Sequence, residues 1–340
     1  MFATLAGGYP LGALPGVTDP LAEARHRRAS DLSSPDAHAD AADRVVTELV
    51  AEQAAAGLAM VHDAWVRWPG GDGLALARGL LAGTIGPAEI ATAWRWADDG
   101  IDAVVKQVLP GPWSASLALA DGDPARAASI RPALADALAA TTRALLDATC
   151  PVIQVQEPGL AALGDDPGAL HDAAGALEAL VAAVPEGTHL SLALTGAAPH
   201  RSTHDRIAAL PYRSFLIDVT AGEDAWRLIE QLPAEQGVVV GAADARKPGV
   251  DDPEMLVWAA TLAAESRGRG HLRVGIATSG DIDHLDRRQA RRKIESMGTA
   301  VVLAKLGPLS DVARALQADP ATCPIGSLRA MMAAHAAAQR

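Results

Sequence analysis

The chain has 340 residues, of which 49% are hydrophobic, and its formal net charge is −12 at pH 7. This length supports a large buried core, and a single α/β barrel with insertions reaches the same size. The acidic balance argues against nucleic acid or an anionic membrane surface as a partner, and no apolar run approaches the roughly 20 residues needed to span a bilayer.

The expected partner is therefore a small-molecule substrate. With only Cys150 and Cys323, the chain can form neither a disulfide framework nor a Cys-rich metal cluster. Its first residues lack the basic start and long apolar stretch of a signal peptide. We expect a cytoplasmic protein; the oligomeric state stays open, with a homodimer among the alternatives.

Short aliphatic runs alternate with alanine-rich helical patterns along the chain, which is typical of parallel βαβ units. The predicted strands are 2–6, 58–63, 101–109, 152–157, 188–194, 214–219, 237–243 and 272–278. The predicted helices include 39–56, 126–148, 168–183, 223–231, 253–267 and 286–304. The segment 18–40, which is rich in Asp, Ala, Ser and Pro, is predicted to be an extended loop.

The number of strand–helix repeats favours a single closed (β/α)8 TIM barrel, an α/β fold, over an open doubly wound sheet. A Rossmann-like sheet is the main rival, but no Gly-x-Gly-x-x-Gly turn follows the first strand. No second domain is evident, so residues 1–340 are expected to form one barrel domain.

Polar side chains follow nearly every predicted strand, where TIM barrels carry their chemistry. The predicted catalytic residues, acids, bases and an anion-binding cation, are Glu157, Asp218, Asp244 and Arg246. The predicted substrate-binding residues are Tyr9, His62, Lys106, Trp113, Gln156 and Ser279. For each carboxylate, a helix cap or a structural ion pair remains the alternative interpretation.

Two segments resemble signature segments of the cobalamin-independent methionine synthase family. Residues 153–160, Ile-Gln-Val-Gln-Glu-Pro-Gly-Leu, are similar to the family's IQ-x-DEPAL segment, and residues 106–112 are similar to K-x-x-L-x-GP. Weaker matches lie in the family's order at 6–10, 53–67, 241–251 and 275–294. The resemblance implies the family's C-terminal or archaeal-type catalytic barrel, a fold related to uroporphyrinogen decarboxylase.

The family moves a methyl group from a folate to homocysteine, whose sulfur binds zinc held by two cysteines, a histidine and a glutamate. In this chain Ser279 stands at the second cysteine position, and Asp218 is the best match for the glutamate.

The family's His-x-Cys pair aligns in either of two registers. One register gives His189 and Ser191, and the other gives Leu192 and Leu194. We favour the second, because His189 opens its predicted strand and would lie far from the mouth of the barrel. Both registers lack a cysteine, so the resemblance implies a divergent member with no metal site and no zinc.

The positions that bind the amino acid in the family also differ. Gln156 replaces the aspartate that holds the homocysteine amine, and Ala64 replaces a glutamate. We therefore expect methyl or one-carbon transfer without zinc, to a substrate other than homocysteine that needs no amino group. A reduced folate (a pterin) is the expected co-substrate. A metal-free lyase or decarboxylase on the same barrel, and a non-catalytic small-molecule-binding homologue, remain open alternatives.

Overall fold

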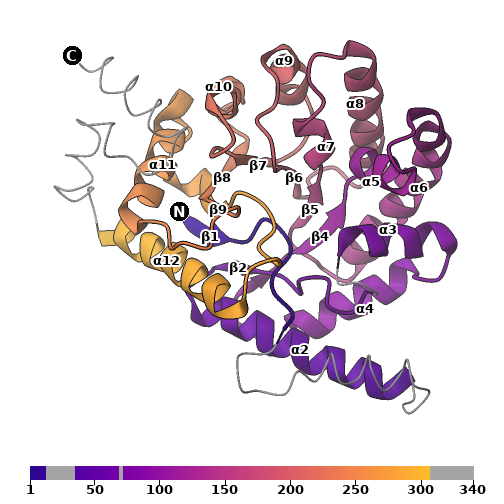
Figure 1. Cartoon of the computed structure of the whole chain (residues 1–340), viewed down its shortest axis with the longest axis horizontal. Coiled ribbons are helices and arrows are strands. Elements are labelled where there is room, and N and C mark those ends of the chain that lie inside the picture. Colours follow the sequence, from indigo (N-terminus) through magenta and orange to yellow (C-terminus); the bar gives the residue numbers. More distant parts are fainter. Residues whose placement is uncertain (13–34, 69–71, 307–340) are drawn as a thin grey trace.

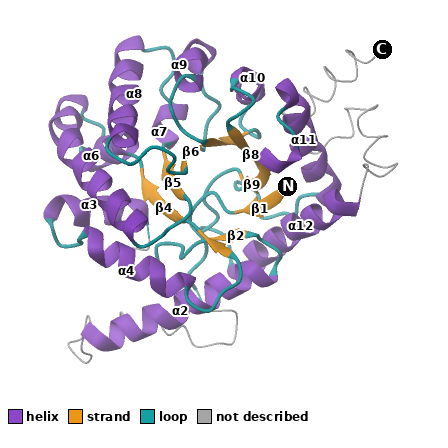
Figure 2. Cartoon of the chain, turned by 180° about the vertical axis from the view of Figure 1, so that it is seen from behind, coloured by secondary structure: helices purple, strands orange, loops and turns teal. Residues whose placement is uncertain are grey.

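The computed structural model describes residues 1–12, 35–68 and 72–306. Seven parallel strands form a curled central sheet, and helices surround it (Figures 1 and 2). In spatial order the strands are β1 (Phe2–Thr4), β9 (Val274–Thr278), β8 (Gly237–Ala243), β7 (Ser214–Asp218), β6 (Leu190–Leu194), β5 (Ile153–Gln156) and β4 (Gln107–Pro110). This arrangement confirms the predicted parallel α/β architecture.

A second sheet of two short strands, β2 (Met60–Val61) and β3 (Val104–Val105), extends the curl beyond β4. The predicted strand 101–109 is divided at Lys106, whose N–H donates to the Val61 carbonyl at 2.9 Å, whereas the next N–H, of Gln107, donates to Val152 at 3.0 Å. β1 and β2 are neighbours, but no ladder joins them in the described residues. The main sheet is thus a half-barrel.

The helices follow the strands on the outside of the sheet (Figure 1). They are α2 (Pro35–Ala55), α3 (Gly73–Ala82), α4 (Pro87–Asp98), α5 (Pro112–Leu119), α6 (Pro124–Asp147), α7 (Pro158–Ala161), α8 (Pro167–Ala182), α9 (His204–Ala208), α10 (Glu223–Gln231), α11 (Pro253–Glu265) and α12 (Arg287–Leu306). Within the described ranges, none of them combines the length and apolar character needed to cross a bilayer.

Local sequence explains where many of these helices begin. The side chains of Asp72, Asp123, Asp166 and Asp252 accept N–H groups in the first turns of α3, α6, α8 and α11. Most of the helices have proline in their first turn, where its missing N–H costs nothing. The predicted loop 18–40 is wrong at its end, because residues 35–40 belong to α2; residues 18–34 lie outside the described ranges.

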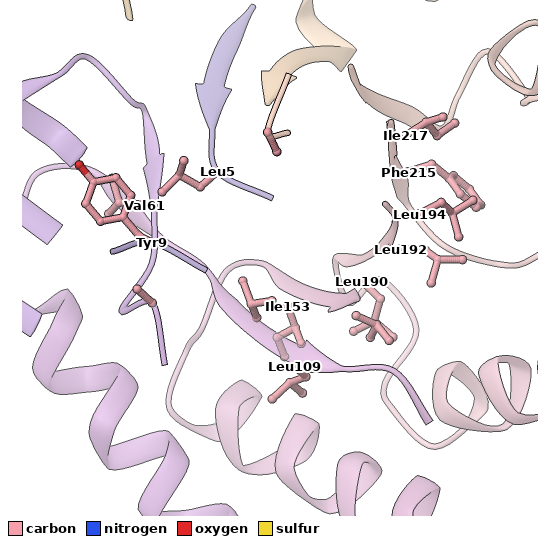
Figure 3. Packing of buried hydrophobic residues seen from close by; sticks show 14 of the residues in the cluster. Leu5, Tyr9, Val61, Leu109, Ile153, Leu190, Leu192, Leu194, Phe215 and Ile217 are labelled. Carbon is pink, nitrogen blue, oxygen red and sulfur yellow. The ribbon is translucent and has the colours of Figure 1, made fainter. Parts of the chain in front are cut away.

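Alternation along the strands separates two apolar layers. Leu192, Leu194, Phe215 and Ile217 belong to the large cluster between sheet and helices (Figure 3). The intervening residues of β6 and β7 face the inside of the curl, where a small cluster contains Ala6, Ala193, Leu216, Val239 and Ala277. The inside of the sheet is therefore apolar at its middle level, and polar side chains occupy its two ends.

Candidate functional site

An ion-pair cluster lies at the carboxyl ends of β7 and β8. The Arg246 guanidinium is 3.1 Å from Asp218 Oδ2 and 3.3 Å from Asp244 Oδ1. Asp218 is fully buried and also accepts the N–H of Thr220 at 3.0 Å and its hydroxyl at 2.7 Å. The side chain of Arg246 is 47% exposed, so the guanidinium bridges a buried carboxylate and the solvent.

The two carboxylates of this cluster differ in their electrostatics. Burial raises the pKa of Asp218, and the contacts with Thr220 and Arg246 offset only part of the rise. Burial acts in the same direction on Asp244, but hydrogen bonds from Lys247 and from the Arg246 N–H outweigh it and lower the pKa of Asp244. Asp218 is thus the better proton carrier, and Asp244 is a stable anion that positions Arg246.

Ser279 joins the same cluster from the end of β9. Its hydroxyl accepts the Ala245 N–H at 2.9 Å, and its own N–H donates to the Ala243 carbonyl at 2.8 Å. A side chain at Gly241 would meet the Cα atoms of Asp218 and Ser279 at 3.2 Å, so glycine allows these strand ends to approach. The structure therefore brings Asp218, Asp244, Arg246 and Ser279 together.

A second polar group lies beside this cluster and includes a residue that the sequence analysis did not select. Gln156 donates to Asp281 Oδ1 at 2.9 Å, and the Gly8 N–H donates to the same oxygen at 2.8 Å. Burial raises the pKa of Asp281. Because Asp281 is two residues beyond Ser279, their Cα atoms lie within about 8 Å, so one loop connects both groups.

A cavity of about 240 Å³ opens next to Gln156 and Asp281. Its other walls include Trp65, Asp72, Ser114 and Asp283. The only sequence signal for Asp281 and Asp283 was their place after the last predicted strand.

Glu157, a predicted catalytic residue, has another position. Its buried carboxylate accepts the N–H groups of Trp113 and Ser114 at 2.9 Å each, and it also accepts the Ser114 hydroxyl. These groups form the first turn of α5, and a Cβ at Gly111 would lie 2.1 Å from the carboxyl carbon. Burial raises the pKa of Glu157 to about 7. The side chain caps α5 and does not line the cavity.

Tyr9 and Trp113, predicted to bind substrate, are also engaged elsewhere. The Tyr9 hydroxyl donates to Glu52 at 2.6 Å, and Glu52 pairs with Arg287 of α12 at 3.0 Å. The Trp113 ring is buried under the Arg131 guanidinium, which lies 4.1 Å from the ring centroid.

His62 and Lys106 are buried inside the protein. The pKa of His62 is lowered to about 3 by burial and by the charge of Lys106, and its Nδ1 accepts the Ala64 N–H at 3.0 Å. Lys106 lines a different cavity, toward the amino ends of the strands. Of the ten predicted site residues, four form the ion-pair cluster, Gln156 belongs to the neighbouring group with Asp281, and the other five are placed elsewhere: Tyr9, His62, Lys106, Trp113 and Glu157.

The side chains near the mouth do not fit a zinc site. Asp218 is paired with Arg246, and the Ser279 hydroxyl is a neutral hydrogen-bond acceptor. No group of three or more His, Cys, Asp or Glu side chains that could hold a metal occurs in the part of the chain that the structure describes.

The alternative registers of β6 also provide no ligand at the mouth. Leu192 and Leu194 pack toward the helices (Figure 3), so the register that we favoured faces away from the site. In the other register, His189 precedes β6 and Ser191 is the second residue of that strand; both line the cavity at the amino ends. The inward residue at the level of Gln156 is Ala193.

No protein-family model and no curated protein matches this chain. Solved structures do match. A candidate vitamin-B12-independent methionine synthase from Listeria monocytogenes has a TM-score of 0.61 at 14% identity, covering 88% of this chain and 98% of the other. A B12-independent methionine synthase from Shewanella sp. W3-18-1, in complex with selenomethionine, has a TM-score of 0.67 at 12% identity, covering 89% and 98%. At this identity the similarity shows a shared fold.

Proposed function

We propose that the chain is a methyl- or one-carbon-transfer enzyme on a methionine-synthase-like barrel, which acts at the carboxyl ends of the strands without zinc. The observation that carries the proposal is the half-exposed Arg246 paired with buried Asp218 beside the Gln156–Asp281 group. The fold shared with a methionine synthase that binds selenomethionine supports a small substrate at this face.

The charges suggest what the acceptor substrate looks like. Arg246 suits a carboxylate or another planar anion. Asp281 supplies a negative charge beside Gln156, where the sequence had led us to expect none, and so favours an acceptor with a basic nitrogen. A neutral amine is itself a nucleophile. The thiol of homocysteine, in contrast, reacts as a thiolate, which the metal in the methionine synthase family helps to form.

A reduced methylfolate is the proposed methyl donor. The acceptor nitrogen forms a bond to the methyl carbon as the bond from that carbon to the folate nitrogen breaks. Asp218, whose pKa is raised by burial, can protonate the leaving nitrogen, and the Asp281 carboxylate can take up the proton that the acceptor nitrogen releases. The products are the methylated amine and the demethylated folate.

Thermal melting with a reduced methylfolate tests this proposal. At 100 times Kd the ligand should add about 2.7 kcal/mol to the free energy of unfolding. Mass spectrometry of amino-acid acceptors incubated with donor and enzyme should then detect one added methyl group. Arg246→Gln should abolish the product, whereas Lys247→Ala, which removes a neighbouring cation exposed to 66%, should retain it.

The metal-free lyase remains a second candidate because Arg246 could equally hold a substrate carboxylate that is lost. Stabilisation by small carboxylic acids, with no response to any reduced pterin, would favour this lyase over the transferase.

Elemental analysis tests the proposed independence from zinc. Zinc sites with thiolate or imidazole ligands have apparent binding free energies on the order of 10 kcal/mol, most of which hydroxyls such as that of Ser279 cannot supply. Protein purified without added metal should carry well below one zinc per chain. One zinc retained through dialysis against a chelator would contradict this proposal and would require ligands other than those considered above.

A further inference from the structure

A second cavity lies at the opposite end of the sheet, at the amino ends of the strands. Its volume is about 300 Å³, which is at the lower limit for small-molecule pockets. It extends inward to the side chains of Lys106 and Gln154, which are 1% and 2% exposed. Barrel interiors are ordinarily filled by apolar layers, so an open polar cavity at this end requires an explanation.

Lys106 is a buried cation without an anionic partner in the described residues. Its ammonium donates to the Leu5 carbonyl at 2.5 Å and to Gln154 Oε1 at 2.6 Å. Both acceptors are neutral, Lys106 forms no ion pair with a carboxylate in that part of the chain, and an ammonium has a third N–H. A buried charge without a counter-charge is costly, so an anion in the cavity would be strongly favoured.

The walls of the cavity indicate the remainder of the ligand. Ser191 and Ser214 contribute hydroxyls, and Ser214 Oγ lies 3.0 Å from His189 Nε2. Phe2, Met60 and Val239 contribute apolar surface. The exposed side chains of Arg213, Glu235 and Arg273 also line the cavity, with a net positive charge. A buried cation, neutral polar groups, apolar walls and this positive balance together suit an organic anion with an apolar body.

We propose that the cavity at the amino ends of the strands is a second ligand site, which binds a small organic carboxylate through Lys106. This site is separate from the proposed transferase site, because Arg246, Asp218 and Asp281 do not line it. The proposal of a second ligand site therefore does not depend on the proposed function.

Isothermal titration calorimetry with 3-phenylpropionate tests the site, and the neutral amide of the same acid serves as the matched ligand. At about pH 6, where Lys106 is charged, the carboxylate should bind at least about tenfold more tightly than the amide. Lys106→Met should remove this preference, and Ser191→Leu, which fills the cavity, should abolish the binding of both ligands. Arg246→Gln, at the other end of the sheet, should change neither.

Several outcomes would overturn the proposal. These are no binding of the carboxylate to the natural protein, equal binding of acid and amide, or a preference that survives Ser191→Leu. Circular dichroism and melting of the free variants verify folding, and Ser191→Leu carries the test if Lys106→Met does not fold. Phenyl phosphate forms a further arm of the experiment. Tighter binding of phenyl phosphate than of the carboxylate would reject the carboxylate assignment.

Discussion

At the level of single residues, the direction of a side chain decides the role of a residue at a strand end. Its position at the end of the strand does not decide the role by itself. Glu157 and Gln156 are adjacent at the end of β5, yet Glu157 turns outward to the first turn of α5 and Gln156 turns inward to Asp281. This difference follows from the alternation of side chains along a strand. The motif alone could not decide it, because the strand register was not known.

The cap formed by Glu157 leads to a prediction about stability. Glu157→Ala leaves the Trp113 and Ser114 N–H groups without their acceptor inside the protein, and should lower the free energy of unfolding by about 2 kcal/mol or more. Denaturant unfolding measures this change. Asp166→Ala is the matched control, because Asp166 caps α8 at an exposed position and its loss should cost about 1 kcal/mol. A smaller effect of Glu157→Ala than of Asp166→Ala would contradict the capping role.

The buried ammonium of Lys106 leads to a prediction about pH. Burial lowers the pKa of Lys106 in the folded protein to about 7, below the value of about 10.4 in the unfolded chain. Between these values the unfolded state binds more protons, so stability rises with pH from about 7 to about 10, by an amount on the order of 4 kcal/mol.

Lys106→Met provides the comparison, because it removes this titration. The free energy of unfolding should be measured across the same pH range in buffers free of carboxylate and phosphate. The natural protein should gain stability relative to the variant as pH rises. A constant difference between the two proteins would mean that Lys106 is paired or solvated in the folded state.

At the level of elements, the sequence was informative wherever a pattern is local. Aliphatic runs predicted strands that overlap all the observed ones, and Asp252 before Pro253 marks the start of α11 as the structure has it. Non-local features were missed. The change of partner at Lys106 depends on where β2 lies, and the role of Asp281 depends on a side chain 125 positions away in sequence.

Close packing between α2 and α12 leads to a prediction at this scale. A Cβ at Gly298 of α12 would lie 1.8 Å from the Ala56 carbonyl oxygen, which is backbone and cannot turn aside. Gly298→Ala should therefore destabilise the protein by about 1–3 kcal/mol through overpacking. Gly175→Ala in α8 is the control, because no atom beyond the neighbouring backbone of α8 lies within 4 Å of the added methyl group.

The control should shift stability in the opposite direction. Alanine is favoured over glycine in a helix by about 0.5–1 kcal/mol, so Gly175→Ala should raise the free energy of unfolding. If both substitutions stabilise the protein, α2 and α12 do not approach as closely as described.

At the level of the whole molecule, the length of the hydrogen-bonded ladder between neighbouring strands varies around the curled sheet. β7 pairs with β8 over five residues, whereas β2 pairs with β3 over two and has no ladder with β1 in the described residues. Two side chains instead connect the segment after β1 to the far edge of the sheet: Lys106, between β3 and β4, donates to the Leu5 carbonyl, and Gln154 of β5 donates to the Ala6 carbonyl. Lys106 and Gln154, which line the cavity at the amino ends of the strands, thus also connect the two edges of the curled sheet.

This uneven pairing predicts where the fold opens first. The Val104 and Lys106 N–H groups, which donate to the carbonyls of Ala59 and Val61, depend on a ladder of only two residues. They should exchange with solvent through a local opening that costs a few kcal/mol less than global unfolding. The amides of β7 and β8 should exchange only with global unfolding, because both strands are buried within the sheet. Native-state hydrogen exchange at low denaturant concentrations separates these two classes. Equal protection of Val104, Lys106 and the β7–β8 amides would show that the whole curl unfolds as one unit.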